Sequence, residues 1–166
     1  MNRQRRAVYP GTFDPITNGH LDIIHRALAV FDCVTVAVIS NPAKKALLAL
    51  PERMALIRRV THGLRGVEVA SFDGLLVDFL RTVRGDVVIR GLRAISDFEY
   101  EFQMALMNRR LNRHAETVFM MPDEKYTYLS SSLVKEVVRF GGQVRGLVTP
   151  PVERVLKEKF RKAVYF

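Results

Sequence analysis

Apolar residues along this chain form two kinds of segment that follow one another. Short runs of β-branched and aliphatic residues are typical of buried strands, whereas longer stretches with apolar residues three or four positions apart are typical of helices. The pattern predicts strands at residues 7–9, 33–39, 67–72, 86–89 and 117–121. It predicts helices that start near residues 18 and 51, and further helices at 75–83, 96–113, 130–140 and 150–162.

Strand and helix alternate from one end of the chain to the other. This order favours a doubly wound α/β fold, in which five parallel strands form one sheet that helices cover on both faces. No linker, repeat or low-complexity segment divides the chain, so we expect residues 1–166 to be a single domain. In such sheets, ligands bind beyond the C-terminal ends of the strands, near the point where the strand order reverses.

The composition limits where the protein can work. Of the 166 residues, 48% are hydrophobic and 26% are charged, as in soluble globular proteins. No apolar run is long enough to span a membrane, and the basic residues 1–6 do not lead into the apolar segment of a signal peptide. A single cysteine, Cys33, cannot form an intrachain disulfide and is consistent with a reducing compartment. We therefore expect a cytoplasmic protein with no membrane partner.

Basic residues outnumber acidic ones, with 26 Lys and Arg against 17 Asp and Glu and a net charge of +9. Such an excess favours a polyanionic partner, either nucleic acid or phosphorylated small molecules. The basic residues are scattered, however, and no zinc-finger spacing or RNA-binding aromatic run is present. The sequence also lacks Gly-x-Gly-x-x-Gly and Gly-x4-Gly-Lys-Ser/Thr, which argues against a dinucleotide dehydrogenase and a P-loop kinase. We interpret the charge as partly a phosphate-binding site and partly ordinary solvated surface.

Residues 9–20, Tyr-Pro-Gly-Thr-Phe-Asp-Pro-Ile-Thr-Asn-Gly-His, connect the first predicted strand to the first predicted helix. Two prolines, two glycines and an asparagine are typical of a tight turn. The helix start offers free N–H donors and a partial positive charge, which together favour a bound anion. Gly19 would let a ligand approach the backbone, and His20 would add a hydrogen-bond donor. A lone Gly-His pair is more often a turn and a cap, but the complete run is much more specific.

Three further segments with phosphate-binding residues follow predicted strands, at 41–45, 90–93 and 125–132. Arg90 and Arg93 carry guanidinium groups, which can bind phosphate oxygens in pairs. Residues 130–132 are three serines at a predicted helix start, where capping accounts for only one of them. Lys44 belongs to a Lys-Lys pair, which by itself is usually a solvated loop. Since all four segments fall at the same edge of the sheet, we expect them to form one site.

These motifs resemble the signatures of the bacterial phosphopantetheine adenylyltransferases, within the nucleotidylyltransferases marked by Thr/His-x-Gly-His. The resemblance covers almost the whole chain and includes Arg-Gly-Leu-Arg at 90–93, Asp-Phe-Glu-Tyr-Glu at 97–101 and Ser-Ser-Leu-Val-Lys-Glu at 131–136. The family has isoleucine before its serines where this chain has Leu129, which is a mild departure. The resemblance implies a Rossmann-like nucleotidylyltransferase fold. It also implies transfer of AMP from ATP, with Mg²⁺, to 4′-phosphopantetheine, which gives dephospho-coenzyme A and pyrophosphate.

The resemblance also assigns individual residues. It implies that catalysis depends on His20, Lys44 and Arg93, with His20 on the α-phosphate oxygens. It implies contacts with the acceptor from Thr12, Lys44, Leu76 and Arg90, and no metal ligand from the protein. It implies contacts with ATP from Thr12, Phe13, His20, Gly91, Leu92, Arg93, Glu101, Tyr126, Thr127, Tyr128, Leu129, Ser130, Ser131 and Ser132.

The long helix at 96–113 begins with a capping-box signature, Ser96 to Glu99, and has apolar residues on two faces. An apolar surface that broad indicates burial on two sides, against the core and against either a subunit or a pocket. The resemblance implies a homohexamer, and it suggests feedback binding of coenzyme A. Two alternatives remain: transfer to another phosphorylated acceptor, and a basic nucleic-acid-binding domain without catalysis. We expect the enzyme, with no nucleic-acid partner.

Overall fold

The computed structural model describes residues 4–40, 46–93 and 95–163. Within these residues, strands and helices alternate as the apolar pattern predicts. The strands are β1 (Arg6–Gly11), β2 (Cys33–Ile39), β3 (Val67–Phe72), β4 (Val87–Gly91) and β5 (Glu116–Met120). The helices are α1 (Asn18–Leu28), α2 (Leu50–Thr61), α3 (Leu76–Thr82), α4 (Ile95–Leu111), α5 (Ser131–Arg139) and α6 (Pro150–Ala163), with a short 3₁₀ helix, η1 (Glu124–Tyr126), before α5.

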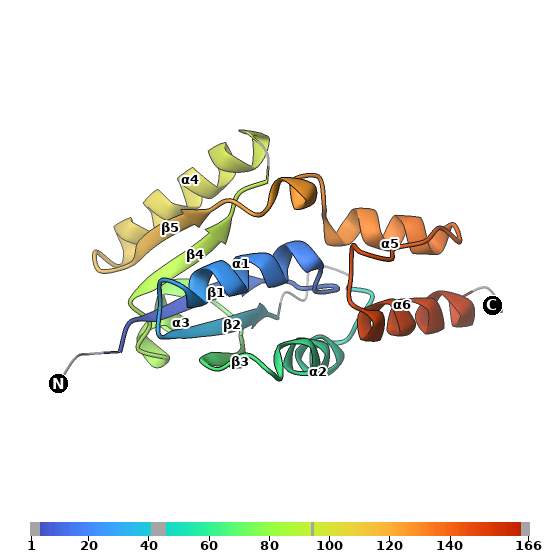
Figure 1. Cartoon of the computed structure of the whole chain (residues 1–166). Helices are drawn as coiled ribbons and strands as arrows, with labels where there is room; N and C mark the ends of the chain where they lie inside the picture. Colours follow the sequence, from blue (N-terminus) through green and yellow to red (C-terminus); the bar gives the residue numbers. More distant parts are fainter. Residues whose placement is uncertain (1–3, 41–45, 94, 164–166) are drawn as a thin grey trace.

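The five strands form one parallel sheet in the order β3-β2-β1-β4-β5, which confirms the predicted architecture. The chain first builds outwards from β1 through β2 to β3, and then crosses back to add β4 and β5 on the other side of β1. The strand order therefore reverses between β1 and β4. In Figure 1 the strands point towards the side of the molecule where η1 and α5 lie. This edge is where a doubly wound sheet binds its ligands.

Strands β1 and β4 pair over a short distance. Their pairing covers Ala7 with Val87 and Val8 with Val88, whereas the pairing of β1 with β2 continues to Gly11. Pro10 has no N–H to donate to a neighbouring strand. Beyond Val8 the two strands are instead bridged by a side chain, because Arg90 Nη1 donates to the Pro10 carbonyl at 2.9 Å. A gap thus opens between the central strands at the switch point.

Alternate side chains of the sheet face two separate cores. Ala7 and Tyr9 of β1 pack in the larger core, which includes apolar residues of α1, α2, α5 and α6. Val8 faces the smaller core, to which α3 contributes. Helix α1 crosses one face of the sheet in Figure 1. Helices on both faces bury the near-continuous apolar strands, as in other parallel sheets.

One predicted helix cap is wrong. Helix α4 already begins at Ile95, so Ser96 lies inside the helix and is not its N-cap. Helix α3 begins at Leu76 with Leu75 as its N-cap, close to the predicted range of 75–83; the preceding Gly74 has a φ of 77°, which makes it a turn residue. Helix ends depend on flanking turns that a local pattern does not determine. Over the described part of the chain, no helix is both long enough and apolar enough to cross a bilayer.

Candidate active site

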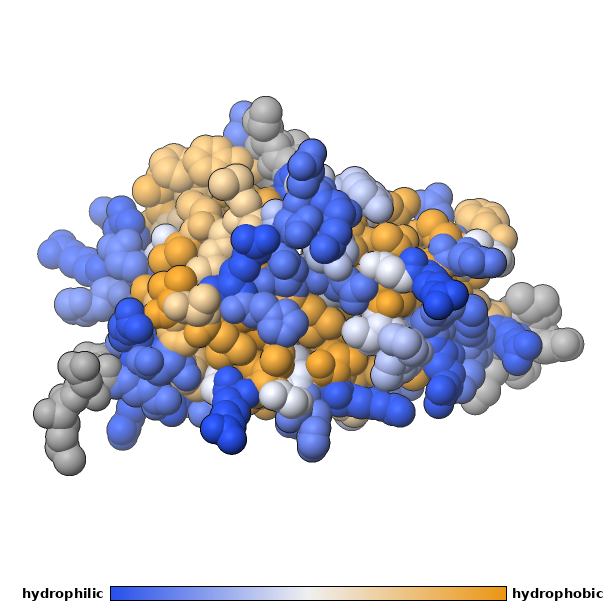
Figure 2. Space-filling view, in the orientation of Figure 1, coloured by the Kyte–Doolittle hydropathy of each residue, from blue (hydrophilic) through white to orange (hydrophobic). Residues whose placement is uncertain are grey.

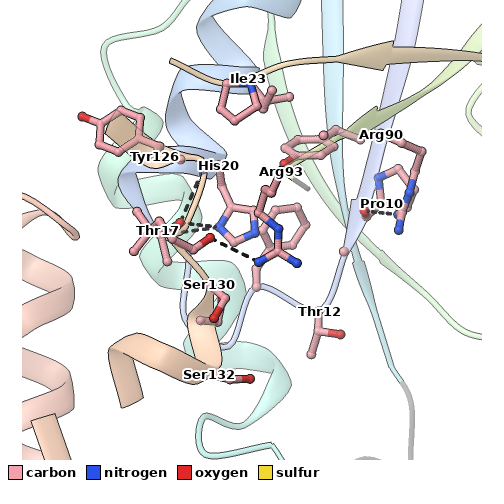
Figure 3. A pocket seen from close by; sticks show the side chains of 18 of the residues that line it. Pro10, Thr12, Thr17, His20, Ile23, Arg90, Arg93, Tyr126, Ser130 and Ser132 are labelled. Atoms are coloured by element: carbon pink, nitrogen blue, oxygen red, sulfur yellow. Dashed lines mark hydrogen bonds between the residues drawn. The ribbon is translucent and has the colours of Figure 1, made fainter. Parts of the chain in front are cut away.

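A cavity of about 270 Å³ lies at the gap between β1 and β4. Three of the four predicted phosphate-binding segments meet there, and Figure 3 shows His20, Arg90, Arg93, Thr12, Ser130 and Ser132 around it. The fourth segment, which contains Lys44, lies outside the described residues. The lining consists of Tyr9, Pro10, Gly11, Thr12, Phe13, Thr17, Gly19, His20, Ile23, Arg90, Gly91, Arg93, Glu101, Pro122, Tyr126, Leu129, Ser130, Ser131 and Ser132.

His20 is fixed at the start of α1 by a capping box. Thr17 is the N-cap of the helix, and its side-chain oxygen accepts a hydrogen bond from the His20 backbone N–H at 3.4 Å. In return, the Thr17 backbone N–H donates to His20 Nδ1 at 3.0 Å, and Thr17 Oγ1 lies 2.9 Å from the same nitrogen. Because Nδ1 accepts a backbone hydrogen bond, it carries no proton. The ring proton therefore sits on Nε2, which leaves an N–H donor for a ligand.

The His20 side chain is neutral at physiological pH. Burial, together with the nearby positive charges of Arg93 and Arg90, lowers the pKa of the imidazole to about 4. A neutral imidazole with its proton on Nε2 can donate a hydrogen bond to an anion without transferring the proton. His20 is thus suited to stabilise charge on a phosphoryl oxygen and unsuited to act as an acid.

Two aromatic rings surround the imidazole. The centroids of the Phe13 and His20 rings lie 5.1 Å apart in an edge-on arrangement, and the Tyr9 ring lies 6.3 Å from His20. Phe13 is buried and also lines the cavity. Its ring is therefore part of the packing around His20. Burial also raises the pKa of Tyr9, which keeps its hydroxyl protonated. This packing restricts the orientation of the histidine ring.

Arg90 is held by three hydrogen bonds. Its Nε donates to Glu101 Oε2 at 2.5 Å, its Nη2 donates to Glu101 Oε1, and its Nη1 donates to the Pro10 carbonyl. Burial alone would lower the pKa of Arg90, but the hydrogen bonds and charge of Glu101 outweigh burial and raise it. The guanidinium is therefore a fixed positive group. Glu101, which was predicted to contact ATP, orients Arg90.

The three serines at the start of α5 differ in what they bind. Ser130 is the N-cap, and its Oγ accepts the backbone N–H of Leu133 at 3.1 Å. Ser131 Oγ donates to the Pro15 carbonyl at 2.7 Å, which ties α5 to the β1–α1 loop. Ser132 is exposed at the cavity. The triplet thus supplies a cap, a tether and an exposed hydroxyl at the positive end of a helix.

Arg93 connects the end of β4 to the start of α5. Its Nη1 donates to the Leu129 carbonyl at 3.2 Å. Figure 3 shows its guanidinium next to the His20 ring. The two helix starts that were predicted to bind phosphate, those of α1 and α5, therefore face one cavity with an arginine between them.

A second cavity, of about 440 Å³, shares part of its wall with the first. The shared residues are Pro10, Gly11, Thr12, Arg90 and Glu101. The rest of the second cavity is mainly apolar and includes Leu76, which was predicted to contact the acceptor. Asn108 is buried there, and Thr117 Oγ1 has no hydrogen-bond partner among the described residues. The two cavities can hold two ligands that meet at Thr12 and Arg90.

Most predicted site residues of the described chain line one of these cavities. Leu92, Thr127 and Tyr128 do not, and their predicted contacts with ATP stay predictions. The backbone N–H of Leu92 bonds the Met120 carbonyl, and Thr127 Oγ1 bonds the Glu124 carbonyl.

The sequence reasoning missed several lining residues. It missed Thr17, because a histidine is not the usual partner in a capping box. It also missed Tyr9 and Ile23, which look like ordinary core residues in the apolar pattern.

The chain is similar to known proteins over most of its length. Residues 8–137 match the model of the cytidylyltransferase-like family. A phosphopantetheine adenylyltransferase from Moorella thermoacetica is 55% identical over 154 residues, which are 93% of this chain and 96% of that protein. A protein of the same name from Clostridium tetani is 57% identical over 157 residues, which are 94% of this chain and 98% of that protein.

Solved structures with the same fold are more distant in sequence. A Vibrio parahaemolyticus protein described as a nicotinate-nucleotide adenylyltransferase has a TM-score of 0.70 at 18% identity, covering 93% of this chain and 99% of its own. A lipopolysaccharide core biosynthesis protein from Thermoplasma volcanium has a TM-score of 0.56 at 20% identity, covering 73% of this chain and 99% of its own. These likenesses support the fold alone. The family model and the close relatives show that the chain belongs to the cytidylyltransferase-like family and, within it, to the phosphopantetheine adenylyltransferases.

Proposed function

We propose that this protein transfers AMP from ATP to 4′-phosphopantetheine, giving dephospho-coenzyme A and pyrophosphate. The observation that carries the proposal is the pair of adjoining cavities with Thr12 and Arg90 in their common wall. The first cavity, with the two helix starts, suits the phosphates of ATP. The second cavity would hold the acceptor with its phosphate at the common wall.

The reaction needs no general base. The nucleophile is a phosphate monoester, whose second pKa is about 6, so it is already largely ionised at neutral pH. Its oxygen attacks the α-phosphorus of ATP in line with the bond to the leaving pyrophosphate. The difficulty is to bring two anions together and to stabilise the charge on the α-phosphoryl group. Positive and N–H-bearing groups are what the cavity supplies.

Each charged or donating residue has a distinct part in this proposal. His20 donates its Nε2–H to an α-phosphate oxygen, where the neutral ring is a donor that keeps its proton. Arg93 and the start of α5 bind the phosphates of ATP, and Arg90, held by Glu101, faces the acceptor phosphate. Lys44, outside the described residues, is proposed to bind the same acceptor phosphate. Together they align the two reactants and offset their charges.

The second cavity suits the chemistry of the acceptor arm. Phosphopantetheine carries two amides along a flexible chain, and a buried amide needs hydrogen-bond partners. Asn108 can both donate and accept, and Thr117 offers a hydroxyl, in a cavity whose other lining is mainly apolar. This combination would distinguish pantetheine from a short acceptor such as glycerol phosphate.

We propose that Mg²⁺ binds together with the co-substrate ATP. Among the described residues, no group of three His, Cys, Asp or Glu side chains could hold a metal ion. The first cavity has one carboxylate in its described lining, that of Glu101, and Arg90 engages both of its oxygens. Mg²⁺ commonly binds substrate phosphates and keeps several waters. We therefore propose that Mg²⁺ binds on the phosphates of ATP.

We also propose that the protein is a homo-oligomer and that it works in the cytoplasm. Its resemblance to the phosphopantetheine adenylyltransferases implies a hexamer. Helix α4 has many large apolar side chains that are exposed in the single chain, and Figure 2 shows apolar residues gathered over this part of the surface. Contiguous apolar surface of this kind is characteristic of protein interfaces. The exposed residues are Phe98, Tyr100, Phe102, Met104, Leu106, Met107 and Leu111. The single cysteine, Cys33, is buried and free, which suits a reducing compartment.

A pyrophosphate-release assay tests the proposed reaction. ATP is offered with phosphopantetheine, nicotinamide mononucleotide or glycerol phosphate in parallel, and we expect release with phosphopantetheine. Release with one of the other two would identify a different acceptor. No release, together with binding to nucleic acid that weakens steeply between two salt concentrations, would favour a non-catalytic nucleic-acid-binding domain.

A further inference from the structure

Arg53 is a buried arginine in α2 that lines neither cavity. Only 6% of Arg53 is exposed to solvent. Among the described residues, no carboxylate pairs with its guanidinium, and its Nε has no hydrogen-bond partner. An ion removed from water costs several kcal/mol unless other groups compensate it. The position of Arg53 therefore has to be explained by the groups that it does contact.

The contacts of Arg53 are two backbone carbonyls. Its Nη1 donates to the Thr12 carbonyl at 2.7 Å and to the Ile39 carbonyl at 3.2 Å. Ile39 ends β2, and Thr12 follows the end of β1. One side chain thus ties together the chain segments that leave two neighbouring strands at the ligand-binding edge. Since Thr12 lines both cavities, this bond acts on their common wall.

The bond to Thr12 also holds a strained turn. The next residue, Phe13, has a φ of 49°, in the left-handed region that costs a non-glycine residue roughly 1–2 kcal/mol. Rotation of the peptide between Thr12 and Phe13 would relieve this strain. The same rotation would turn the Thr12 carbonyl away from Arg53 and shift the Phe13 ring, which packs 5.1 Å from the His20 ring.

From these contacts we infer that Arg53 is a positioning residue for AMP transfer. It holds the Thr12–Phe13 turn and, through that turn, the common wall of the two cavities and the packing of His20. The effect on turnover rests on the proposed function, whereas the effect on the turn does not. Arg53 lies behind the site, so its removal should disturb the alignment of the reactants more than their binding.

Kinetics of three variants test the role in turnover. Arg53→Met removes the donors but keeps a long side chain, and Arg53→Lys keeps a cation that can donate to both carbonyls. Arg59→Met, at an exposed position on the same helix, is the control. For Arg53→Met, measured well below its melting temperature, we expect about a 100-fold lower kcat, the scale of a 1 Å misplacement. The dissociation constants for ATP and phosphopantetheine should stay within threefold.

The Lys variant and the control separate positioning from folding. The kcat of Arg53→Lys should be at least tenfold higher than that of Arg53→Met, and the kcat of Arg59→Met should match that of the wild type. An Arg53→Met protein with a lower melting temperature but normal kcat would overturn the inference, because Arg53 would then only stabilise the fold. A loss of ATP affinity as large as the loss of kcat would also overturn it.

A spectroscopic measurement tests the turn without turnover. The NMR signal of the His20 ring Hε1 depends on the ring current of Phe13. We expect this signal to move in Arg53→Met and to return towards its wild-type position in Arg53→Lys. An unmoved signal would refute the role in positioning. If the wild-type protein itself fails with phosphopantetheine, the proposed acceptor is wrong, and this measurement still decides the role of Arg53.

Discussion

Replacing His20 with alanine should remove one hydrogen bond from the transition state without removing a charge. The imidazole is neutral at pH 7, because burial and the two arginines lower its pKa to about 4. The loss is therefore that of a neutral donor aimed at developing charge, which typically costs about 10²–10³ in kcat, or about 2.7–4 kcal/mol. ATP affinity should fall much less, since Arg93 and the helix starts, which we propose to bind the phosphates, are unchanged.

The same substitution should have a small effect on stability. His20 is the third residue of its helix and accepts the Thr17 backbone N–H in the capping box. Loss of a cap costs about 1 kcal/mol, which corresponds to a shift of roughly 2–4 °C in Tm for a chain of this size. The large kinetic effect and the small thermal effect are thus separable.

The assay compares His20→Ala with His25→Ala, which changes an exposed histidine of the same helix. Pyrophosphate release gives kcat, calorimetric titration gives the dissociation constant for ATP, and thermal unfolding gives Tm. We expect His25→Ala to match the wild type in all three. A folded His20→Ala protein with normal kcat would remove His20 from the mechanism.

Three other measurements test separate parts of the molecule. Lys44→Ala should weaken phosphopantetheine binding by about 1.5–3 kcal/mol and leave ATP affinity nearly unchanged, with Lys45→Ala as the baseline; lost ATP affinity instead would assign this lysine to the other substrate. Burial would raise the pKa of Asp14, but hydrogen bonds from Lys135 and two backbone N–H groups lower it below its ordinary 3.8. The wild type should therefore be more stable than Asp14→Asn by a constant amount above about pH 5, and this difference should shrink as the pH falls below 4. Urea unfolding from pH 7 to 3 measures this, and a constant difference would contradict it. Light scattering should give a multiple of 19.0 kDa, and a single 19.0 kDa species at micromolar concentration would contradict the oligomer.

The sequence by itself determined the architecture and the edge of the sheet where the site lies. The periodicity of apolar residues shows which side of each element is buried. The period itself distinguishes strands from helices, even when the segments that pack against them are unknown. Alternation of the two then requires a parallel sheet, whose strand ends gather at one edge. For that reason the turn at 9–20, the arginines at 90 and 93 and the serine triplet could be assigned to one site before their contacts were known.

Only the tertiary structure decided how these groups are held. Arg90 of strand β4 is oriented by Glu101 of helix α4, and Arg53 reaches a carbonyl 41 residues earlier in the chain. The proton position on His20 depends on a single backbone N–H, and the three serines, identical in sequence, have three different roles. Hydrogen bonds join particular atoms at fixed distances and angles, and those are set when distant segments pack together. Residue types and their spacing carry no record of that geometry, which is why the sequence located the site and the fold determined its hydrogen bonds.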